Sequence, residues 1–126
     1  GVRVRLLLPA RSDVPLVQLL GRSYYGPLLK NGIEIYELQG EILHAKVMLI
    51  DGERTVVGSA NLDQRSLHRN FEINLIIDDT AFSGQVEAML RKGLADSRRI
   101  SLDDHERRGL LVRLLERMID PFSWFL

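Results

Sequence analysis

A histidine and a lysine stand two residues apart in His44-Ala45-Lys46, within a run that is otherwise almost wholly apolar. On a β-strand, residues two apart project from the same face, so both side chains can act on one ligand. Placing an imidazole and an ammonium in an apolar strand is costly unless partners or a ligand compensate. The pair predicts a binding or catalytic site. The alternative is a satisfied core histidine beside a lysine whose charged end reaches solvent.

Neutral hydrogen-bond donors follow at the end of the next predicted strand, in Gly58-Ser59-Ala60-Asn61. Glycine permits close backbone approach there, while Ser59 and Asn61 supply donors. Together with Lys46 these donors can hold a phosphate and the charge that develops on it during transfer. Turn formation and helix capping ahead of residues 62–67 is the alternative role, and both roles are compatible.

A carboxylate is the part of such a site that orients the imidazole. It fixes the ring tautomer and leaves the other nitrogen free to attack phosphorus. Glu72 lies within the predicted apolar strand 71–77, so we predict that it is a buried acid that orients His44. A cross-strand pair with an arginine is the alternative role of Glu72.

These residues resemble the signature of the phospholipase D superfamily, which is H-x-K, four residues, D, six residues, then G-S or G-T, and x-N. Each fixed position is matched, by His44, Lys46, Asp51, Gly58, Ser59 and Asn61. The similarity extends over about residues 1–79, where segments 32–37, 61–67 and 70–72 look like bacterial cardiolipin synthases. Asp51 belongs to the signature, but it also precedes Gly52 at a strand end, where it can tie down the turn.

The resemblance implies a transfer in two steps, in which one histidine forms a phosphohistidine and a second protonates the leaving alcohol. The two histidines belong to two motif copies, and this chain has one, because His68 and His105 lack the accompanying lysine and Gly-Ser-x-Asn. We therefore expect half an active site, completed by a second motif-bearing half of the same protein or by a homodimer mate. The start at Gly1 suits an excised C-terminal half. Whether His44 is the nucleophile or the general acid stays open.

The implied function is phosphatidyl transfer of the cardiolipin synthase kind, with phosphatidylglycerol or a similar phospholipid as substrate. A phospholipase D or nuclease-type phosphodiesterase that works as a homodimer is the first alternative, and a noncatalytic interaction module is the second. The resemblance places the protein peripherally on the cytoplasmic side of the cytoplasmic membrane. We expect no metal and no cofactor, and no nucleic-acid partner, because basic and aromatic residues are not interleaved.

Bulk composition is compatible with this hypothesis. The chain has 126 residues, 45% of them hydrophobic and 27% charged, which suits one globular domain. Lysine and arginine (17) balance aspartate and glutamate (17), so no net field selects an anionic partner. The absence of cysteine excludes disulfides and thiolate chemistry. The sequence contains no apolar run of the roughly 20 residues that a membrane span needs.

The elements that must position these residues follow from hydrophobic periodicity and turn residues. Strands are predicted at residues 2–8, 33–38, 43–50, 55–58 and 71–77, and helices at 14–30, with a break near 26–27, at 81–94 and at 103–119. The fold class is α/β, an α+β sandwich with one mixed β-sheet flanked by helices, in a single phospholipase D-like half-domain over residues 1–126. The last helix is basic and amphipathic and precedes an aromatic tail at 121–126, so it either contacts a membrane surface or packs on the protein.

Overall fold

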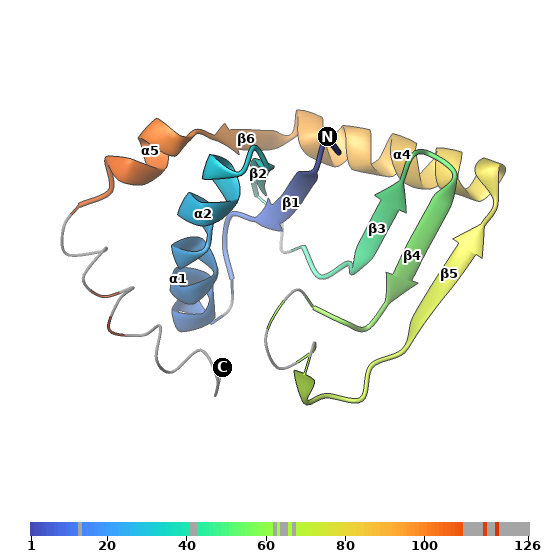
Figure 1. The fold of residues 1–126 in the computed structure, drawn as a ribbon, viewed down its shortest axis with the longest axis horizontal. Coiled ribbons are helices and arrows are strands. Elements are labelled where there is room, and N and C mark those ends of the chain that lie inside the picture. The colour runs from blue at the N-terminus through green and yellow to red at the C-terminus, as the bar shows by residue number, and fades with distance from the viewer. Residues whose placement is uncertain are drawn as a thin grey trace. The chain divides into compact units, whose positions relative to one another are not determined.

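The computed structural model describes residues 1–12, 14–40, 43–61, 63, 66, 68–109, 115 and 118 (Figure 1). The chain divides into two compact units, one formed by Gly1–Leu43 with Asp96–Leu126 and the other by His44–Ala95. Each unit contains a three-stranded sheet. The predicted α/β class is confirmed, while the strands expected in one mixed sheet are divided between two sheets.

The sheet of the first unit has the order β1-β2-β6, formed by β1 (Arg5–Pro9), β2 (Glu34–Leu38) and β6 (Ser97–Ile100). β1 and β2 are parallel, and β2 and β6 are antiparallel. A parallel pair needs a crossover connection, which α1 (Pro15–Ser23) and α2 (Tyr25–Lys30) provide.

The break between these two helices lies at Tyr24 rather than at the predicted Gly26-Pro27. Proline lacks an N–H and clashes with the carbonyl four residues earlier, which here belongs to Ser23, the last residue of α1. Because proline is tolerated in a first helical turn, a new helix begins at Tyr25 and accommodates Pro27. The predicted cap residue Asp13 lies outside the described residues. Ser12 Oγ accepts a hydrogen bond from Val14 N at 3.1 Å.

The core of the first unit gathers around Ile35, which is fully buried with Tyr25 and Ile100 beside it. Burying one such aliphatic side chain contributes roughly 1.5–3 kcal/mol. Partly buried apolar residues complete the cluster, namely Leu8, Leu28, Leu29 and Ile33. The helical pair and the strands therefore hold one another in place by packing.

β6 and the helix that follows it differ from the sequence expectation. β6 was not predicted, because Ser97-Arg98-Arg99-Ile100 has little apolar character and becomes a strand by pairing with β2. The helix predicted at 103–119 begins as α5 (Leu102–Glu106), capped by a reciprocal Ser101–Asp104 box, and ends there at a turn. Most of residues 110–119 and the whole tail 121–126 lie outside the described residues.

The second unit holds an antiparallel sheet of order β3-β4-β5, formed by β3 (Val47–Ile50), β4 (Arg54–Gly58) and β5 (Asn74–Asp78). Helix α4 (Thr80–Ala95) packs against it (Figure 1). The contact includes the fully buried hydroxyls of Thr55 and Ser83, which lie 2.9 Å apart. Ser83 Oγ also donates to Glu53 O at 2.9 Å, so these buried polar atoms are satisfied.

Candidate active site

The residues of the signature other than Asp51 lie at one end of the second sheet. His44 and Lys46 precede β3 instead of lying within the strand, so the predicted strand 43–50 begins later than expected. Gly58 N nevertheless donates to Lys46 O at 3.1 Å, which places the end of β4 beside this segment. On the other side of β4, Gly58 pairs with Asn74, the first residue of β5. Antiparallel pairing therefore joins three segments that are separate in sequence.

The side chains of His44 and Lys46 lie together, as their spacing predicted. Lys46 Nζ is 3.1 Å from Nδ1 and 3.2 Å from Nε2 of the imidazole, and it donates to His44 O at 2.9 Å. His44 is exposed, so it is not the satisfied core histidine of the alternative interpretation. This arrangement places the imidazole beside a positive charge that suits a phosphoryl oxygen.

Gly58 is required at its position by the close approach of the chain before β5. A Cβ atom there would lie 2.7 Å from Asn74 Cα, and nearer still to Asn74 Oδ1 and Ile73 O. Atoms that are not bonded do not approach so closely, and two of these three belong to the backbone. The glycine of the signature therefore permits the contact that brings Ser59 to Ile73.

Ser59 and Glu72 form the best-connected part of the site. Ser59 Oγ donates to Glu72 Oε2 at 2.5 Å and accepts from Ile73 N at 3.1 Å, while Ser59 N donates to Ile73 O at 3.0 Å. A hydroxyl has a single proton, and here that proton is directed at the carboxylate. Ser59 can donate to a phosphate only after its hydroxyl turns away from Glu72.

Glu72 differs from its predicted environment in two respects. It precedes β5, outside the strand ladder, and it is half-buried rather than buried. Its hydrogen bonds within the described residues go to Ser59 and to Asn70 Nδ2 (3.4 Å), and none reaches His44. The expected orientation of His44 by Glu72 therefore stays a prediction, whereas a cross-strand pair with arginine does not fit a position outside the ladder.

The pKa of Glu72 lies below its usual range. The hydrogen bond from Ser59 is the largest cause, and the Ser66 hydroxyl, Asn70 and the charge of Lys46 act in the same direction. Ser66 Oγ is buried, and among the described residues its interaction with Glu72 falls outside the distance and angle limits of a hydrogen bond. Glu72 is consequently held as a carboxylate, the form that accepts a hydrogen bond.

Asn61 is exposed, and its side chain makes no hydrogen bond within the part of the chain that the structure describes. The cap in this region comes from a residue that the sequence analysis missed, because Asp63 Oδ1 accepts from Ser66 N at 2.7 Å. An acidic residue three positions before a helical serine is the signal that identifies such a cap. Asn61 therefore remains available for the predicted phosphate contact.

Asp51 lies at the opposite end of β3, five residues from Lys46, which corresponds to about 16 Å along a strand. Its φ is +52° and that of Gly52 is +75°, and Glu53 N donates to Ile50 O at 3.1 Å. Positive φ at both central positions of the turn 50–53 gives a backbone twist that matches a hairpin, and the connection has three residues because Ile50 pairs with Arg54. The geometry supports the turn role of Asp51 rather than contact with a ligand held at Lys46.

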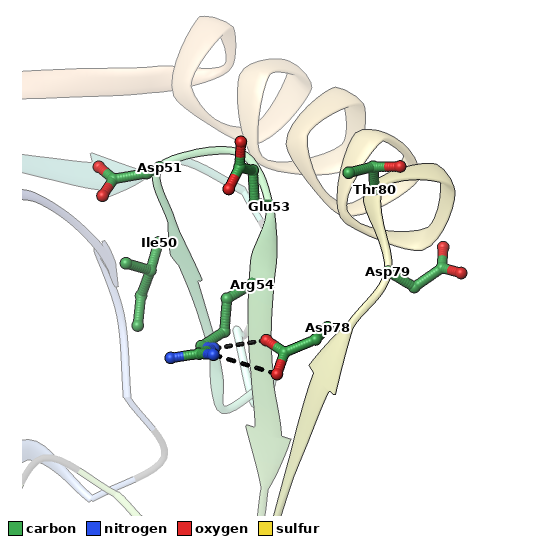
Figure 2. Close-up of a pocket in the computed structure, with 7 residues that line it drawn as sticks. All are labelled: Ile50, Asp51, Glu53, Arg54, Asp78, Asp79 and Thr80. Carbon is green, nitrogen blue, oxygen red and sulfur yellow. Dashed lines mark hydrogen bonds and ion pairs between the residues drawn. The ribbon is translucent and has the colours of Figure 1, made fainter.

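A cavity of about 570 Å³ lies at this turn end of the sheet (Figure 2). Figure 2 shows Arg54 pointing at Asp78, with which it forms a two-bonded ion pair. The lining residues are Ile50, Asp51, Glu53, Arg54, Asp78, Asp79 and Thr80. Four carboxylates against one guanidinium repel an anion, so this cavity does not suit a phosphodiester. Within the described residues, no group of three His, Asp or Glu side chains could hold a metal ion.

The sequence matches the family described as "Cardiolipin synthase, PLD-like domain" over residues 1–93. The chain belongs to this phospholipase D-like family. It is 41% identical over 123 residues to cardiolipin synthase A from Citrobacter koseri and from Salmonella arizonae. That alignment covers 98% of this chain and 25% of the relatives, so this phospholipase D-like domain spans about a quarter of their length.

The fold of the phospholipase D-like domain is similar to that of Nuc, a phospholipase D family member from Salmonella typhimurium. The TM-score is 0.67 at 18% identity, and the match covers 80% of this chain and 66% of the Nuc chain. The recognised family and the fold expected from it are thus confirmed. None of the helices in the described ranges has the length and apolarity that crossing a membrane requires.

Proposed function

We propose that this domain contributes one half of the active site of a phosphatidyl transferase that works through a phosphohistidine. The observation that carries the proposal is the cluster at the end of the second sheet, where Lys46 Nζ lies 3.1 Å from a ring nitrogen of His44. The family match and the identity to cardiolipin synthase A support phospholipid as the substrate class.

The chemistry of the first step follows from the groups in the cluster. A ring nitrogen of His44 attacks phosphorus, a P–N bond forms, and the bond from phosphorus to the leaving oxygen breaks. The leaving alcohol takes a proton from a second histidine, which then accepts a proton from the incoming hydroxyl as the P–N bond is broken. In the reverse assignment, His44 is this proton donor and the second histidine is the nucleophile.

The remaining groups stabilise charge. Lys46 is placed to neutralise a phosphoryl oxygen, and Asn61 offers uncommitted amide donors. Ser59 joins them when its hydroxyl rotates from Glu72 to the phosphate. Glu72 then loses its shortest hydrogen bond, which leaves its carboxylate available for the proposed bond from the His44 ring.

The second histidine must come from outside this chain's single motif. We propose that it belongs to another motif-bearing part of the same protein, because the chain spans only a quarter of its relatives' length. A homodimer mate is the alternative source. Phosphatidylglycerol or a similar lipid is the proposed substrate, at the cytoplasmic face of the membrane.

Replacing His44 by alanine in the intact protein tests the proposal. Loss of a nucleophile or general acid should lower turnover of phosphatidylglycerol by at least about 10³-fold. His68→Ala is the matched control, because His68 is exposed and lies outside the cluster. Retained activity in the His44 variant would refute the assignment.

Product analysis separates the remaining alternatives. A new phosphodiester formed with phosphatidylglycerol or glycerol supports transfer, whereas release of free phosphatidate alone indicates a phosphodiesterase. If the protein neither forms an acid-labile phosphoprotein nor consumes any diester, the noncatalytic module is the better interpretation.

A further inference from the structure

A buried hydroxyl lies beside the candidate site and is used by no step of the proposed reaction. Ser66 is only 7% exposed, and within the described residues its Oγ atom has no hydrogen-bond partner. Leaving a buried hydroxyl unpaired costs stability, so such a group calls for an explanation. The Ser66 backbone is held in place, since its N–H donates to Asp63 Oδ1 at 2.7 Å. The hydroxyl can therefore rotate about its own bonds while the backbone stays fixed.

The Ser66 hydroxyl faces the carboxylate of Glu72. After the hydrogen bond from Ser59, it is the next largest influence that lowers the pKa of Glu72, ahead of Asn70 and the charge of Lys46, whereas desolvation acts in the opposite direction. The two groups nevertheless fall outside the limits of a hydrogen bond in the unliganded protein. Ser66 is thus a donor that is directed at Glu72 and not yet engaged by it.

Ser59 has two uses for a single proton. Its Oγ donates to Glu72 Oε2 at 2.5 Å in the unliganded protein. When this hydroxyl turns to the phosphate, Glu72 keeps, within the described residues, only the long bond from Asn70 Nδ2 at 3.4 Å. A carboxylate that has lost its best donor is easier to protonate, and a protonated Glu72 offers the His44 ring a much weaker acceptor. The reaction therefore needs another donor to Glu72 at this stage.

We propose that Ser66 is a positioning residue, whose hydroxyl binds the Glu72 carboxylate when Ser59 turns to the phosphate. This inference rests on the proposed function, because the phosphate of the substrate sets off the exchange. Each serine supplies one O–H donor, and the same acceptor receives them in turn. Each hydroxyl keeps its own proton, so only hydrogen bonds are exchanged. Glu72 stays ionised and in place for His44, although Ser66 itself does not touch the substrate.

The kinetic test compares Ser66→Ala with Ser83→Ala in the intact protein, with phosphatidylglycerol as the substrate. Ser83 is the matched control because it is also a buried serine, but its hydroxyl pairs with Thr55 and with Glu53 O at the turn end of the sheet. Ser66→Ala should lower kcat by about tenfold and leave KM within about twofold, since the lost contact is with Glu72 and not with the lipid. Ser83→Ala should leave both constants within about twofold of wild type.

The pH profile is a readout that a merely structural serine would not move. A donor to a carboxylate lowers its pKa, so removal of the Ser66 hydroxyl raises the pKa of Glu72, and the acid limb of kcat should move to higher pH. A carbon-13 NMR titration of the Glu72 carboxyl group should show the same upward shift without substrate. Ser83→Ala should alter neither the acid limb nor the titration.

Thermal stability gives an independent comparison of the same two variants. Ser66→Ala removes no hydrogen bond that Ser66 Oγ makes within the described residues, so it should melt at or above the wild-type temperature. Ser83→Ala removes two hydrogen bonds from a fully buried hydroxyl, so it should melt at a lower temperature. Ser66→Cys keeps the size of the side chain with only a weak donor, and it replaces Ser66→Ala if that variant does not fold.

An unaltered kcat and an unaltered acid limb in Ser66→Ala would overturn the proposal, and so would a loss of kcat that Ser83→Ala shares equally. Failure of this inference is separable from failure of the proposed function. If His44→Ala is inactive while Ser66→Ala behaves as wild type, only the exchange of serines is wrong. If His44→Ala retains activity, the phosphohistidine reaction itself is wrong.

Discussion

Replacing Gly58 by alanine tests the close approach on which the site depends. The added Cβ would meet Asn74 Cα at 2.7 Å, together with Asn74 Oδ1 and Ile73 O at shorter range. Inserting one carbon into a packed site costs about 1–3 kcal/mol, and the upper end applies because backbone atoms cannot rotate away. The lower entropy of the unfolded alanine chain offsets about 0.4–1 kcal/mol of this cost.

The expected net effect of Gly58→Ala is a loss of about 2 kcal/mol in the free energy of unfolding. For a chain of this size, the melting temperature should fall by roughly 5–10 °C. Turnover should fall as well, because the shift displaces Ser59. Urea and thermal unfolding, followed by circular dichroism, measure the stability change.

Gly84→Ala is the matched control, because Gly84 lies inside α4 and, among the described residues, a Cβ there would meet no atom within 4 Å apart from its chain neighbours and the helix backbone. Alanine in a helix interior should stabilise the chain by about 0.5–1 kcal/mol, so the two substitutions should have opposite signs. A Gly58→Ala chain as stable as wild type, or stabilised like Gly84→Ala, would refute the close packing against Ile73 and Asn74.

Three further substitutions test other parts of the structure. Asp51→Gly should change stability by less than about 1 kcal/mol and leave turnover unaltered, since glycine adopts the positive φ freely and the turn lies far from Lys46. Ser59→Ala should raise the pKa of Glu72 toward its usual value in a carbon-13 NMR titration of the carboxyl group, because the largest cause of the depression is removed. Arg22→Ala should destabilise the chain by about 3 kcal/mol in urea unfolding, because Glu37 is buried and loses the charged partner that binds it at 2.9 Å.

The outcomes that contradict these expectations are specific. A fall in turnover of more than about tenfold for Asp51→Gly would place Asp51 in the chemistry. A carboxylate with a depressed pKa stabilises the folded state above its unfolded pKa, and this contribution is lost as pH falls through the folded pKa. Ser59→Ala should therefore reduce the acid sensitivity that Glu72 causes, and an unchanged titration contradicts the hydrogen bond. For Arg22, the exposed pair Arg54–Asp78 gives the control, since Arg54→Ala should cost less than about 1 kcal/mol.

The sequence by itself determined that His44 and Lys46 lie together, because this pattern is local. His44 and Lys46 are two residues apart, and their side chains meet whether or not the backbone between them is a regular strand. The turn at Asp51-Gly52 was also predictable, since few residue pairs adopt two positive φ angles in succession. The hairpin then brings Gly58 to Lys46 without any information from the rest of the chain.

The tertiary structure decided the features whose partners are distant in sequence. β6 forms because β2 offers a free edge, and its own residues carry almost no strand signal. Glu72 meets Ser59 instead of His44 because the segment before β5 crosses Gly58 closely, a contact over 13 residues that no periodicity encodes. Arg98 lies opposite Glu37 only because β6 pairs with β2, while Arg22 on α1 forms the ion pair with Glu37. Burial and charge pairing depend on which segments pack together, and a residue pattern alone does not specify that choice.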